Sequence, residues 1–379
     1  MIRLLSVVGA RPNFMKIAPI VEEVKKFSDI EHCLVHSGQH YDELLSGSFF
    51  TDLGLPRPDV NLHAGSGSHA VQTAEIMKRI EPVLLDYKPQ MLLVVGDVNS
   101  TAASALTAVK LGIGVAHIEA GLRSFDMTMP EEINRKLTDA ISTLLFVTES
   151  GGVVNLKNEG VPPDKIFLVG NVMIDSLLRH RELAARSPVL DQLGLRQNGN
   201  GSGCRPYAVL TLHRPSNVDD PKTLQGILTA ISALAADLPV FFPIHPRTRR
   251  NIESFGLQRY LASADTKGGV GIVPLDPLGY IDFLSLNDRA RLVLTDSGGI
   301  QEETTVLGVP CLTLRENTER PATVEHGSNQ VIGVDPDRIL AAARSLLQKP
   351  AHQFQVPPLW DGKTAPRIVA ILRERLQSG

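Results

Sequence analysis

Apolar residues along the chain gather in short runs that alternate with longer stretches of helical periodicity. In the first half, the short runs cover residues 2–8, 32–36, 91–95, 114–118, 144–147 and 166–169. Helical patterns lie between them, at residues 14–26, 71–85, 101–111, 131–141 and 152–158. Continuous apolar strands separated by helices are typical of a parallel sheet covered by helices on both faces. The first half is therefore predicted to be a doubly wound α/β domain.

The same alternation starts again after a stretch rich in Gly, Asn and Ser at residues 191–205, which predicts an exposed loop near a domain junction. The second series of strands is predicted at residues 207–212, 240–244, 271–273, 292–295, 311–314 and 331–333. We therefore expect an α/β protein of two Rossmann-like, doubly wound domains, residues 1–170 and 171–362. Residues 363–379 are expected to form a C-terminal helix, for which packing back on the first domain is one arrangement.

Two such domains that face each other leave a cleft, bounded by the carboxyl ends of both sheets, where folds of this kind bind ligands. The composition adds limits to this picture. The formal net charge of −3 over 379 residues disfavours non-specific binding of nucleic acid or a membrane surface. The cysteines Cys33, Cys204 and Cys311 lack metal-type spacing, and reduced thiols are expected. No apolar run approaches the roughly twenty residues of a membrane span, so a cytoplasmic protein is expected.

A glycine-rich turn in the second half predicts an anion site. Ser297, Gly298 and Gly299 follow an apolar run and precede a helical stretch. Glycines remove side-chain bulk where a helix begins, so that backbone N–H groups and the helix dipole can face a phosphate. Glu303, in the first turns of this helix, could accept hydrogen bonds from a ribose diol. An N-capped helix with a tight turn and solvated glutamates is the alternative, and this segment alone does not separate the two.

Basic residues follow the first predicted strand. Arg11 and Lys16 lie in a turn that opens onto a helix, an arrangement that suits a phosphate or another anion. The turn does not carry the Gly-x-Gly-x-x-Gly pattern, so a dinucleotide is disfavoured. Solvated basic residues flanking a turn are the alternative.

Three carboxylates and a histidine stand at or near the ends of predicted strands: Asp97, Glu119, Glu131 and His213. Three of them have a structural alternative, namely turn capping for Asp97, compensation of the helix dipole for Glu131 and a local hydrogen bond for His213. Several neighbouring carboxylates raise at least one pKa, which separates acid from base roles. No Cys/His cluster suggests a metal and no nucleophile elbow is present. The residues by themselves predict proton-transfer chemistry on an anionic, phosphate-bearing substrate.

The motifs in chain order resemble those of one family, the non-hydrolysing UDP-N-acetylglucosamine 2-epimerases. They are GARPNFMK, SGQHYDE, GDVNST, HIEAGLRS, PEEINR, LTLHR, TDSGGIQEE and NTERP, between Gly9 and about Gly333. The resemblance implies a glycosyltransferase-B-like fold, with UDP held mainly by the second domain and the sugar between the domains. It also implies interconversion of UDP-GlcNAc and UDP-ManNAc without a nicotinamide cofactor, and a homodimer. In the family, UDP is eliminated to 2-acetamidoglucal and added back.

The resemblance also implies roles for individual residues. Asp97, Glu119 and Glu131 match the catalytic carboxylates and His213 the catalytic histidine, without an assignment of acids to the two faces of C2. The residues that resemble substrate or UDP contacts are Arg11, Lys16, Phe283 near the uracil, Ser297, Gly298 and Gly299 around the phosphates, Glu303 on the ribose, and Arg320.

The chain departs from the family pattern in places. Leu278 stands where some relatives carry Gln, which removes that side-chain contact to the base. Many bacterial relatives are activated by UDP-GlcNAc at a second site that uses Arg-Arg-Glu-Asn after the catalytic histidine. Here the sequence is Arg-Pro-Ser-Asn at 214–217, and Asp42 stands in the Gln-rich part of the SGQH segment. These differences predict weak or absent activation.

Other functions remain open at this point. Residues 124–130, SFDMTMP, are similar to relatives that epimerise UDP-2,3-diacetamido-2,3-dideoxyglucuronate, whereas the TERP sequence at 318–321 favours the GlcNAc branch. A hydrolysing epimerase that releases ManNAc and UDP, a glycosyltransferase of the same fold and a non-catalytic UDP-sugar sensor are the alternatives. The cluster of carboxylates favours an epimerase, because transferase chemistry rarely needs so many.

Overall fold

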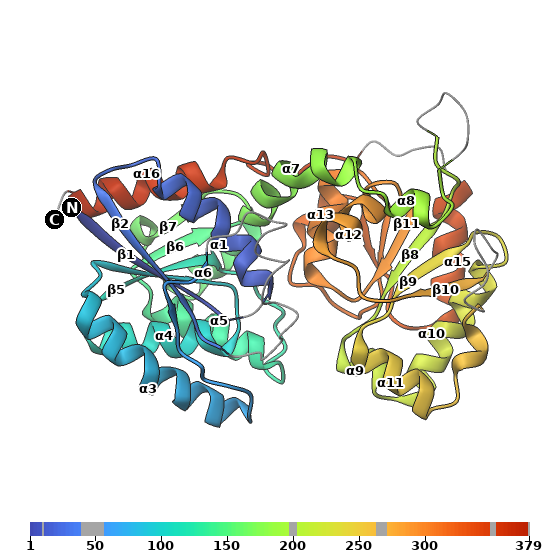
Figure 1. Ribbon diagram of the computed structural model, residues 1–379, viewed down its shortest axis with the longest axis horizontal. Helices are drawn as coiled ribbons and strands as arrows, with labels where there is room; N and C mark the ends of the chain where they lie inside the picture. The colour runs from blue at the N-terminus through green and yellow to red at the C-terminus, as the bar shows by residue number, and fades with distance from the viewer. Residues whose placement is uncertain (10, 39–56, 197–202, 263–270, 349–353, 378–379) are drawn as a thin grey trace. The chain divides into compact units, whose positions relative to one another are not determined.

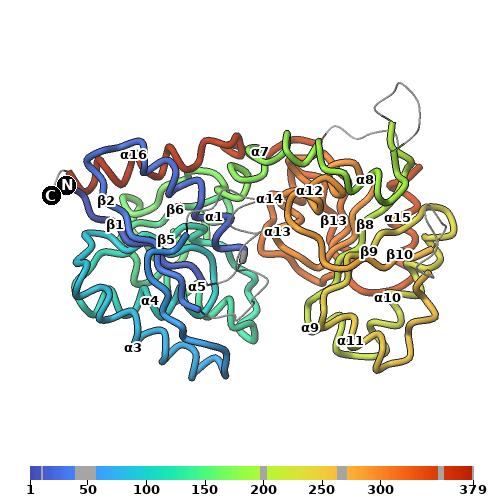
Figure 2. The backbone as a smooth tube through the Cα atoms, in the orientation of Figure 1, coloured from blue at the N-terminus to red at the C-terminus, as the bar shows by residue number. Residues whose placement is uncertain are grey.

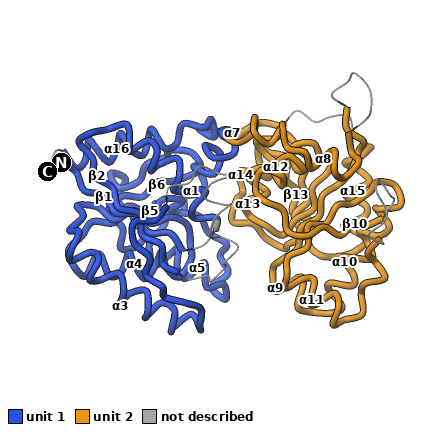
Figure 3. Tube along the Cα trace, viewed as in Figure 1, with its two compact units in different colours: residues 1–179, 358–379 blue, residues 180–357 orange. Residues whose placement is uncertain are grey.

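The computed structural model describes residues 1–9, 11–38, 57–196, 203–262, 271–348 and 354–377 (Figure 1). The chain divides into two compact units (Figure 3). Unit 1 comprises residues 1–179 and 358–379, and unit 2 comprises residues 180–357. Helix α7 (Val172–Ala185) carries the chain from the first unit into the second.

Within the described residues, unit 1 contains a parallel sheet of seven strands in the order β3-β2-β1-β4-β5-β6-β7. The strands are β1 (Ile2–Val8), β2 (Ile30–His36), β3 (Val60–Asn61), β4 (Met91–Val95), β5 (Gly114–Ala120), β6 (Leu144–Val147) and β7 (Ile166–Leu168). The helices are α1 (Arg11–Val24), α3 (His69–Tyr87), α4 (Asn99–Lys110), α5 (Pro130–Ile141), α6 (Ser150–Asn158) and α16 (Thr364–Gln377). Helices α1 and α16 cover one face of the sheet, and α3, α4 and α5 lie on the other (Figure 1).

Unit 2 contains a second parallel sheet, whose described strands follow the order β10-β9-β8-β11-β12-β13. Its strands are β8 (Ala208–Thr211), β9 (Val240–Pro243), β10 (Ile272–Leu275), β11 (Leu292–Thr295), β12 (Cys311–Thr313) and β13 (Asn329–Val331). Its helices are α8 (Val189–Gln192), α9 (Pro215–Val218), α10 (Pro221–Leu234), α11 (Pro246–Ser254), α12 (Tyr280–Asp288), α13 (Gly298–Leu307), α14 (Ala322–Glu325) and α15 (Pro336–Gln348). The predicted α/β class with doubly wound parallel sheets is confirmed.

Both sheets have the Rossmann strand order, in which the first strand of the unit lies beside the fourth. The order of the strands reverses at these central pairs, β1 with β4 and β8 with β11. Ligands of open α/β sheets bind outside the carboxyl ends of the strands at such a switch point, because the connections on either side leave in opposite directions. The residues that follow these four strands are therefore the ones to inspect for chemistry.

The central strands form the core, as their apolar composition predicts. All five residues of β4 are buried, and Leu4 and Leu5 of β1 are fully covered. The main difference from the predicted strands concerns β5, which was expected to end at residue 118 but continues to Ala120. Glu119 therefore lies inside the strand, at an irregularity of the β5–β6 pairing, and not after it. The two-residue strand β3 was not predicted, because two residues are too few to form the apolar run by which the other strands were recognised.

The C-terminal segment belongs to unit 1. Ile368, Val369 and Leu372 of α16 are buried, and the helix packs beside α1 (Figure 2). The indole Nε1 of Trp360 donates a hydrogen bond to the carbonyl of Thr148 over 2.9 Å, so the segment is also tied to the end of β6. Among the described residues, no helix is both long and apolar enough to cross a membrane.

Candidate active site

The switch point of unit 1 brings the ends of β1, β4 and β5 together. Asn13, in the first turn of α1, donates from Nδ2 to the carbonyl of Val95 at the end of β4, over 2.9 Å. Gly96 follows with a φ of +71°, and a Cβ atom there would lie 3.4 Å from Oε2 of Glu119 and 3.5 Å from Nζ of Lys16. A glycine suits this turn because it accepts the left-handed conformation; the tightest contact of a Cβ atom would be with Nδ2 of Asn13, over 3.3 Å.

Lys16 and Glu119 form a buried ion pair at this point. Their side chains are 10% and 2% exposed, and Nζ of Lys16 contacts Oε2 of Glu119. The other carboxylate oxygen, Oε1, is buried and has no hydrogen-bond partner among the described residues. In such a carboxylate one oxygen contacts a cation and the other has no hydrogen-bond partner. The second oxygen is suited to take up or release a proton.

The backbone of Glu119 has a φ of +71°, in the left-handed region that L residues other than Asn and Asp rarely adopt. The register of β5 against β6 shifts between Ile118 and Ala120, so Glu119 occupies a bulge. Such a conformation costs on the order of 1–3 kcal/mol and persists only where the surrounding structure imposes it, which is typical of functional sites. The bulge re-aims the Glu119 side chain toward Lys16.

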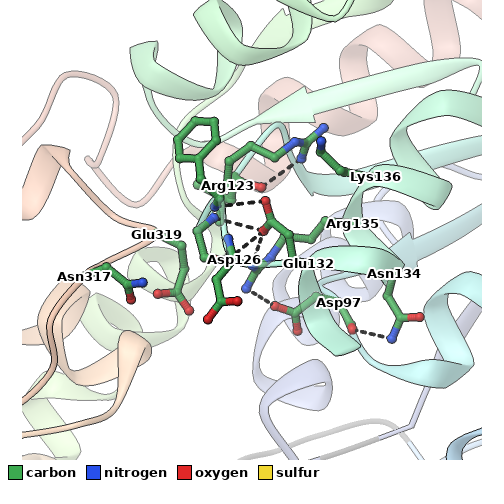
Figure 4. Close-up of polar contacts among 12 residues, drawn as sticks. Asp97, Arg123, Asp126, Glu132, Asn134, Arg135, Lys136, Asn317 and Glu319 are labelled. Carbon is green, nitrogen blue, oxygen red and sulfur yellow. Dashed lines mark hydrogen bonds and ion pairs between the residues drawn. The ribbon is translucent and has the colours of Figure 1, made fainter. Parts of the chain in front are cut away.

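Asp97 follows Gly96, and these two residues after β4 are called the Asp97 turn. The Asp97 carboxylate is paired with a second cation (Figure 4). Arg135 of α5 donates from Nη2 to Oδ2 of Asp97 over 2.5 Å and from Nη1 to Oε2 of Glu132 over 3.0 Å. The Asp97 side chain is 27% exposed, so it reaches solvent while Arg135 holds it from behind. Asn134 donates to the Asp97 carbonyl over 2.9 Å. Helix α5 thus fixes the position of the Asp97 turn from two successive residues.

Glu132, in the first turn of α5, is fully buried. Its carboxylate accepts hydrogen bonds from the backbone N–H groups of Ser124 over 2.9 Å and Phe125 over 3.1 Å, and from Arg135 (Figure 4). Burial raises the pKa of Glu132, but these hydrogen bonds outweigh burial and hold the pKa below its usual value. Glu132 therefore joins the segment after β5 to Arg135. Glu131 lies half-buried in the first turn of α5.

The switch point of unit 2 places His213, after β8, against Asp296, after β11. Nδ1 of His213 lies 2.8 Å from Oδ1 of Asp296, whose side chain is fully buried. Asp296 also accepts hydrogen bonds from the backbone N–H groups of His213 and Arg214, each over 2.9 Å. Burial raises the pKa of Asp296, but His213 and these backbone donors outweigh it and hold the pKa below its usual value. Because Nδ1 faces the carboxylate, Nε2 is the ring nitrogen left for a substrate, and the ring is 42% exposed.

The turn after Asp296 has the features of an anion site. Ser297 is the N-cap residue of α13, and its side chain makes no capping hydrogen bond. The helix begins at Gly298 and Gly299, without an acidic residue in its first turn. A Cβ atom on Gly298 would lie 2.6 Å from Nη1 of Arg320, so the glycine allows that guanidinium to approach the helix terminus. Nε of Arg320 donates to Oε1 of Glu302 over 2.7 Å. Backbone N–H groups and an arginine at one helix N-terminus favour a phosphate.

Glu303 and Phe283 lie on the neighbouring helices α13 and α12. The pKa of Glu303 is raised to about 7, chiefly by burial; the Tyr280 hydroxyl lowers it and the nearby Glu302 raises it. Phe283 is half-buried against the apolar cluster of unit 2, so it contributes to packing there. The side chain of Arg11 lies outside the described part of the chain.

The structure thus gathers Lys16, Asp97 and Glu119 in unit 1, and His213 and Ser297 to Gly299 with Arg320 in unit 2. Sequence reasoning did not identify Arg135, Glu132 and Asp296, which hold the predicted residues in place. The spacing of Glu132 and Arg135, three residues apart on a helix, was a signal for their pairing. For Asp296, the signal was its place at the end of a buried strand. Among the described residues, no group of three or more His, Cys, Asp or Glu side chains could hold a metal ion.

Comparison with known proteins points to one family. The family model for UDP-N-acetylglucosamine 2-epimerase matches residues 22–373. A UDP-N-acetylglucosamine 2-epimerase of Methanocaldococcus jannaschii is 41% identical over 381 residues, which cover 98% of this chain and 98% of that protein. A UDP-2,3-diacetamido-2,3-dideoxy-D-glucuronate 2-epimerase of Pseudomonas aeruginosa is 41% identical over 350 residues, 92% of this chain and 93% of that protein.

Among solved structures, this chain is similar to a crystal structure of the M. jannaschii UDP-GlcNAc 2-epimerase in complex with UDP-GlcNAc and UDP. The TM-score is 0.88 at 41% identity, over 98% of this chain and 100% of that one. Two Rossmann-like sheets of this kind make up the glycosyltransferase-B-like fold, as predicted. The match of the family model over most of the chain, together with the extent of these similarities, shows that the chain belongs to the UDP-N-acetylglucosamine 2-epimerase family.

Proposed function

We propose that the protein is a non-hydrolysing epimerase that interconverts UDP-GlcNAc and UDP-ManNAc. The observation that carries this proposal is the pair of carboxylates at the switch point of unit 1. Asp97 lies against Arg135 with a side chain that is 27% exposed, and Glu119 lies against Lys16 with one carboxylate oxygen that has no hydrogen-bond partner among the described residues. Two carboxylates held in this way suit the removal of a proton from one face of a carbon and its delivery to the other.

The proposed reaction is an anti elimination followed by re-addition. A carboxylate removes the C2 proton, the C2–H electron pair forms the C1–C2 double bond, and the C1–O bond breaks with its electron pair on UDP. The 2-acetamidoglucal then takes UDP back at C1 while a proton is delivered to the opposite face of C2. Hydrogen leaves and returns as a proton, so the reaction needs no nicotinamide cofactor.

In this proposal, unit 1 supplies the proton-transferring groups Asp97, Glu119 and Glu131, with Lys16 and Arg11 as contacts to the anionic substrate. Unit 2 supplies the grip on UDP. The N-terminus of α13 at Ser297, Gly298 and Gly299, together with Arg320, suits the diphosphate, and it stabilises the charge that develops on departing UDP. Glu303 accepts from the ribose diol, Phe283 lies near the uracil, and His213 presents Nε2 as a further catalytic group.

One experiment tests this function. The protein is incubated with UDP-GlcNAc in deuterated water, and C2 is followed by NMR. We expect deuterium at C2 together with UDP-ManNAc. Free ManNAc with UDP would instead indicate that water intercepts the intermediate, and the absence of C2 exchange would favour a transferase or a sensor.

Epimerisation of UDP-2,3-diacetamido-2,3-dideoxyglucuronate is the second candidate. It is favoured by the similarity to the P. aeruginosa enzyme, whose identity of 41% equals that of the M. jannaschii enzyme. The two candidates differ in the groups at C3 and C6 of the sugar. Supplying both nucleotide sugars separately, with kcat/KM as the readout, identifies the substrate: we expect the higher value for UDP-GlcNAc.

We further infer that the protein acts as a homodimer in the cytoplasm. The support is the family to which the chain belongs, together with a nucleotide-sugar substrate. Light scattering coupled to size exclusion measures the mass in solution, for which twice the 41.1 kDa of one chain is expected. Cell fractionation tests the compartment.

A further inference from the structure

A buried histidine lies directly behind the two proposed catalytic carboxylates of unit 1. His117 is in β5, is 0% exposed and has no part in the proposed reaction. Its Nδ1 lies 2.6 Å from Oδ1 of Asp139, and its Nε2 lies 2.9 Å from the carbonyl oxygen of Gly96. A backbone carbonyl can only accept a hydrogen bond, and so can an ionised carboxylate. Both ring nitrogens of His117 therefore donate.

The charges of this ring and its buried neighbours are paired. Asp139 is also buried, and its Oδ2 lies 2.7 Å from Nη1 of Arg123. Arg123 in turn contacts Oε2 of Glu159 over 2.6 Å. With both ring nitrogens protonated, His117 and Arg123 provide two positive charges against the two negative charges of Asp139 and Glu159. A buried charge is tolerated when it is paired and hydrogen-bonded in this way.

Asp139 fastens the strand on both sides of Glu119. One carboxylate oxygen accepts from the His117 ring, two residues before Glu119, and the other accepts from the backbone N–H of Gly121, two residues after it, over 3.0 Å. The residue between them is the one with the left-handed backbone in the β5 bulge. A single side chain of α5 thus holds the bulge at both ends, which supplies the constraint that the unfavourable φ of Glu119 requires.

The other nitrogen of His117 holds the second carboxylate. Gly96, whose carbonyl it binds, immediately precedes Asp97, and the Gly96 N–H donates to the carbonyl of Ile118 over 3.1 Å. The Asp97 turn is therefore attached to β5 through the residue before Glu119 and through the ring of His117. A shift of the ring would move the Asp97 turn and the Glu119 bulge relative to each other.

We propose that His117 is a positioning residue that couples the Asp97 turn to the Glu119 bulge. It thereby sets the distance between the Asp97 and Glu119 carboxylates that act on the substrate. The inference rests on the proposed epimerase function and deepens it. Misplacement of a catalytic group by about 1 Å can cost on the order of a hundredfold in rate. Loss of the hydrogen bond to Gly96 is therefore expected to act on turnover more than on substrate binding.

Two variants separate the two hydrogen bonds of the ring. In His117→Gln, the side-chain amide reaches the place of Nε2 and can still donate to the Gly96 carbonyl. In His117→Asn, the shorter amide reaches the place of Nδ1 and can still donate to Asp139, but not to Gly96. Both replace a ring by a neutral amide in the same buried site. We expect the Gln variant to keep kcat within about tenfold of the unmodified protein and the Asn variant to lose about a hundredfold, with little change in KM for either.

His32→Asn is the matched control. His32 lies in β2 of the same sheet, near the amino end of the strand, and its Nε2 contacts Oγ of Ser6 over 2.8 Å. This variant is expected to lose stability without a change in kcat per folded molecule, which is quantified by circular dichroism. UDP binding by calorimetry, expected to be unchanged in all three variants, reports on unit 2.

Equal turnover in the two His117 variants, or higher turnover in the Asn variant, would overturn the proposal, because the bond to Gly96 would then not matter. If neither variant folds, nitrogen-15 NMR of the unmodified protein decides: two ring N–H groups on His117 support the proposal, and one N–H group refutes it. An unmodified protein that folds and shows both ring N–H groups but exchanges no C2 hydrogen contradicts the proposed function, not the geometry of His117.

Discussion

At the scale of single residues, the proposed chemistry depends on which groups hold each carboxylate. Asp97 and Glu119 are both acids at the ends of buried strands, yet Arg135 holds the first and Lys16 the second. The exposed fractions of the two side chains also differ, 27% for Asp97 and 2% for Glu119. Two chemically similar groups thus differ in burial and in the cation that each contacts, and such differences in surroundings are how one site can use two carboxylates in different roles.

Asp97→Asn keeps the shape of the side chain and removes its capacity to take up a proton. Turnover is expected to fall by roughly two or more orders of magnitude, as the loss of a positioned proton-transfer group does. UDP binding is expected to stay intact, because the proposed UDP contacts lie in unit 2. The measurements are C2 exchange and calorimetry with UDP. Asp86→Asn, at an exposed position of α3, is the control. Near-normal exchange in the Asp97 variant would remove this residue from the mechanism.

Glu303 predicts a pH dependence of stability in the unliganded protein. Burial raises its pKa from 4.5 to about 7, so the folded state binds this proton more tightly than the unfolded state. The contribution of this protonated carboxyl to the free energy of unfolding is fully present below pH about 4.5 and is lost as the pH rises through about 7. The whole contribution is on the order of 3 kcal/mol.

Glu303→Gln should therefore flatten the decline of the free energy of unfolding between pH about 5 and about 8. Urea unfolding at several pH values, followed by circular dichroism, measures the slope. Glu325→Gln, at an exposed position of α14, should leave the slope unchanged. If the Glu303 variant keeps the slope of the unmodified protein, the decline has another origin.

At the scale of elements, the loops after the central strands carry the site and the packing of helices onto strands determines their shape. Gly121, directly after β5, has a φ of +80°, and a Cβ atom there would lie 2.5 Å from the carbonyl oxygen of Gly152 in α6. The close approach of α6 therefore depends on two glycines, and it constrains the segment that follows Glu119.

Gly121→Ala tests this constraint. A left-handed alanine costs roughly 1–2 kcal/mol, and the steric conflict with α6 adds about 1–3 kcal/mol. Gly112→Ala is the matched control, because Gly112 has a φ of +75° and no atom within 4 Å of the built Cβ. Chemical denaturation should show a larger loss of stability for Gly121→Ala than for Gly112→Ala. Equal losses would mean that the contact with α6 relaxes without cost.

At the scale of the whole molecule, the chain offers a prediction about regulation. The segment after His213 begins helix α9 at Pro215, and Arg214 lies 3.6 Å from Glu319, within unit 2. Proline and serine stand where many bacterial relatives have the arginine and glutamate of their activator site, and Asp42 lies outside the described residues. Two residues of that Arg-Arg-Glu-Asn sequence are thus replaced in this chain.

We therefore expect a saturation curve for UDP-ManNAc that a trace of UDP-GlcNAc does not shift. Initial rates at varied UDP-ManNAc, with and without the trace, make the measurement. A relative that carries the Arg-Arg-Glu-Asn sequence serves as the positive control in the same assay. A strong shift of the curve for this protein would show that other residues form an activator site.

The sequence alone determined the layers of the molecule, because apolar runs and helical periods depend on local burial and need no knowledge of distant partners. Most predicted strands lie within one or two residues of the observed ones, and Asp97 and His213 were correctly expected after strands. Only the tertiary structure decided which groups hold the site: Arg135 against Asp97, Asp296 against His213 and the ring of His117 beneath Gly96. These contacts join residues up to 83 positions apart. The bulge at Glu119 likewise arises from pairing with β6 and from Asp139, since a glutamate has no local preference for a left-handed backbone.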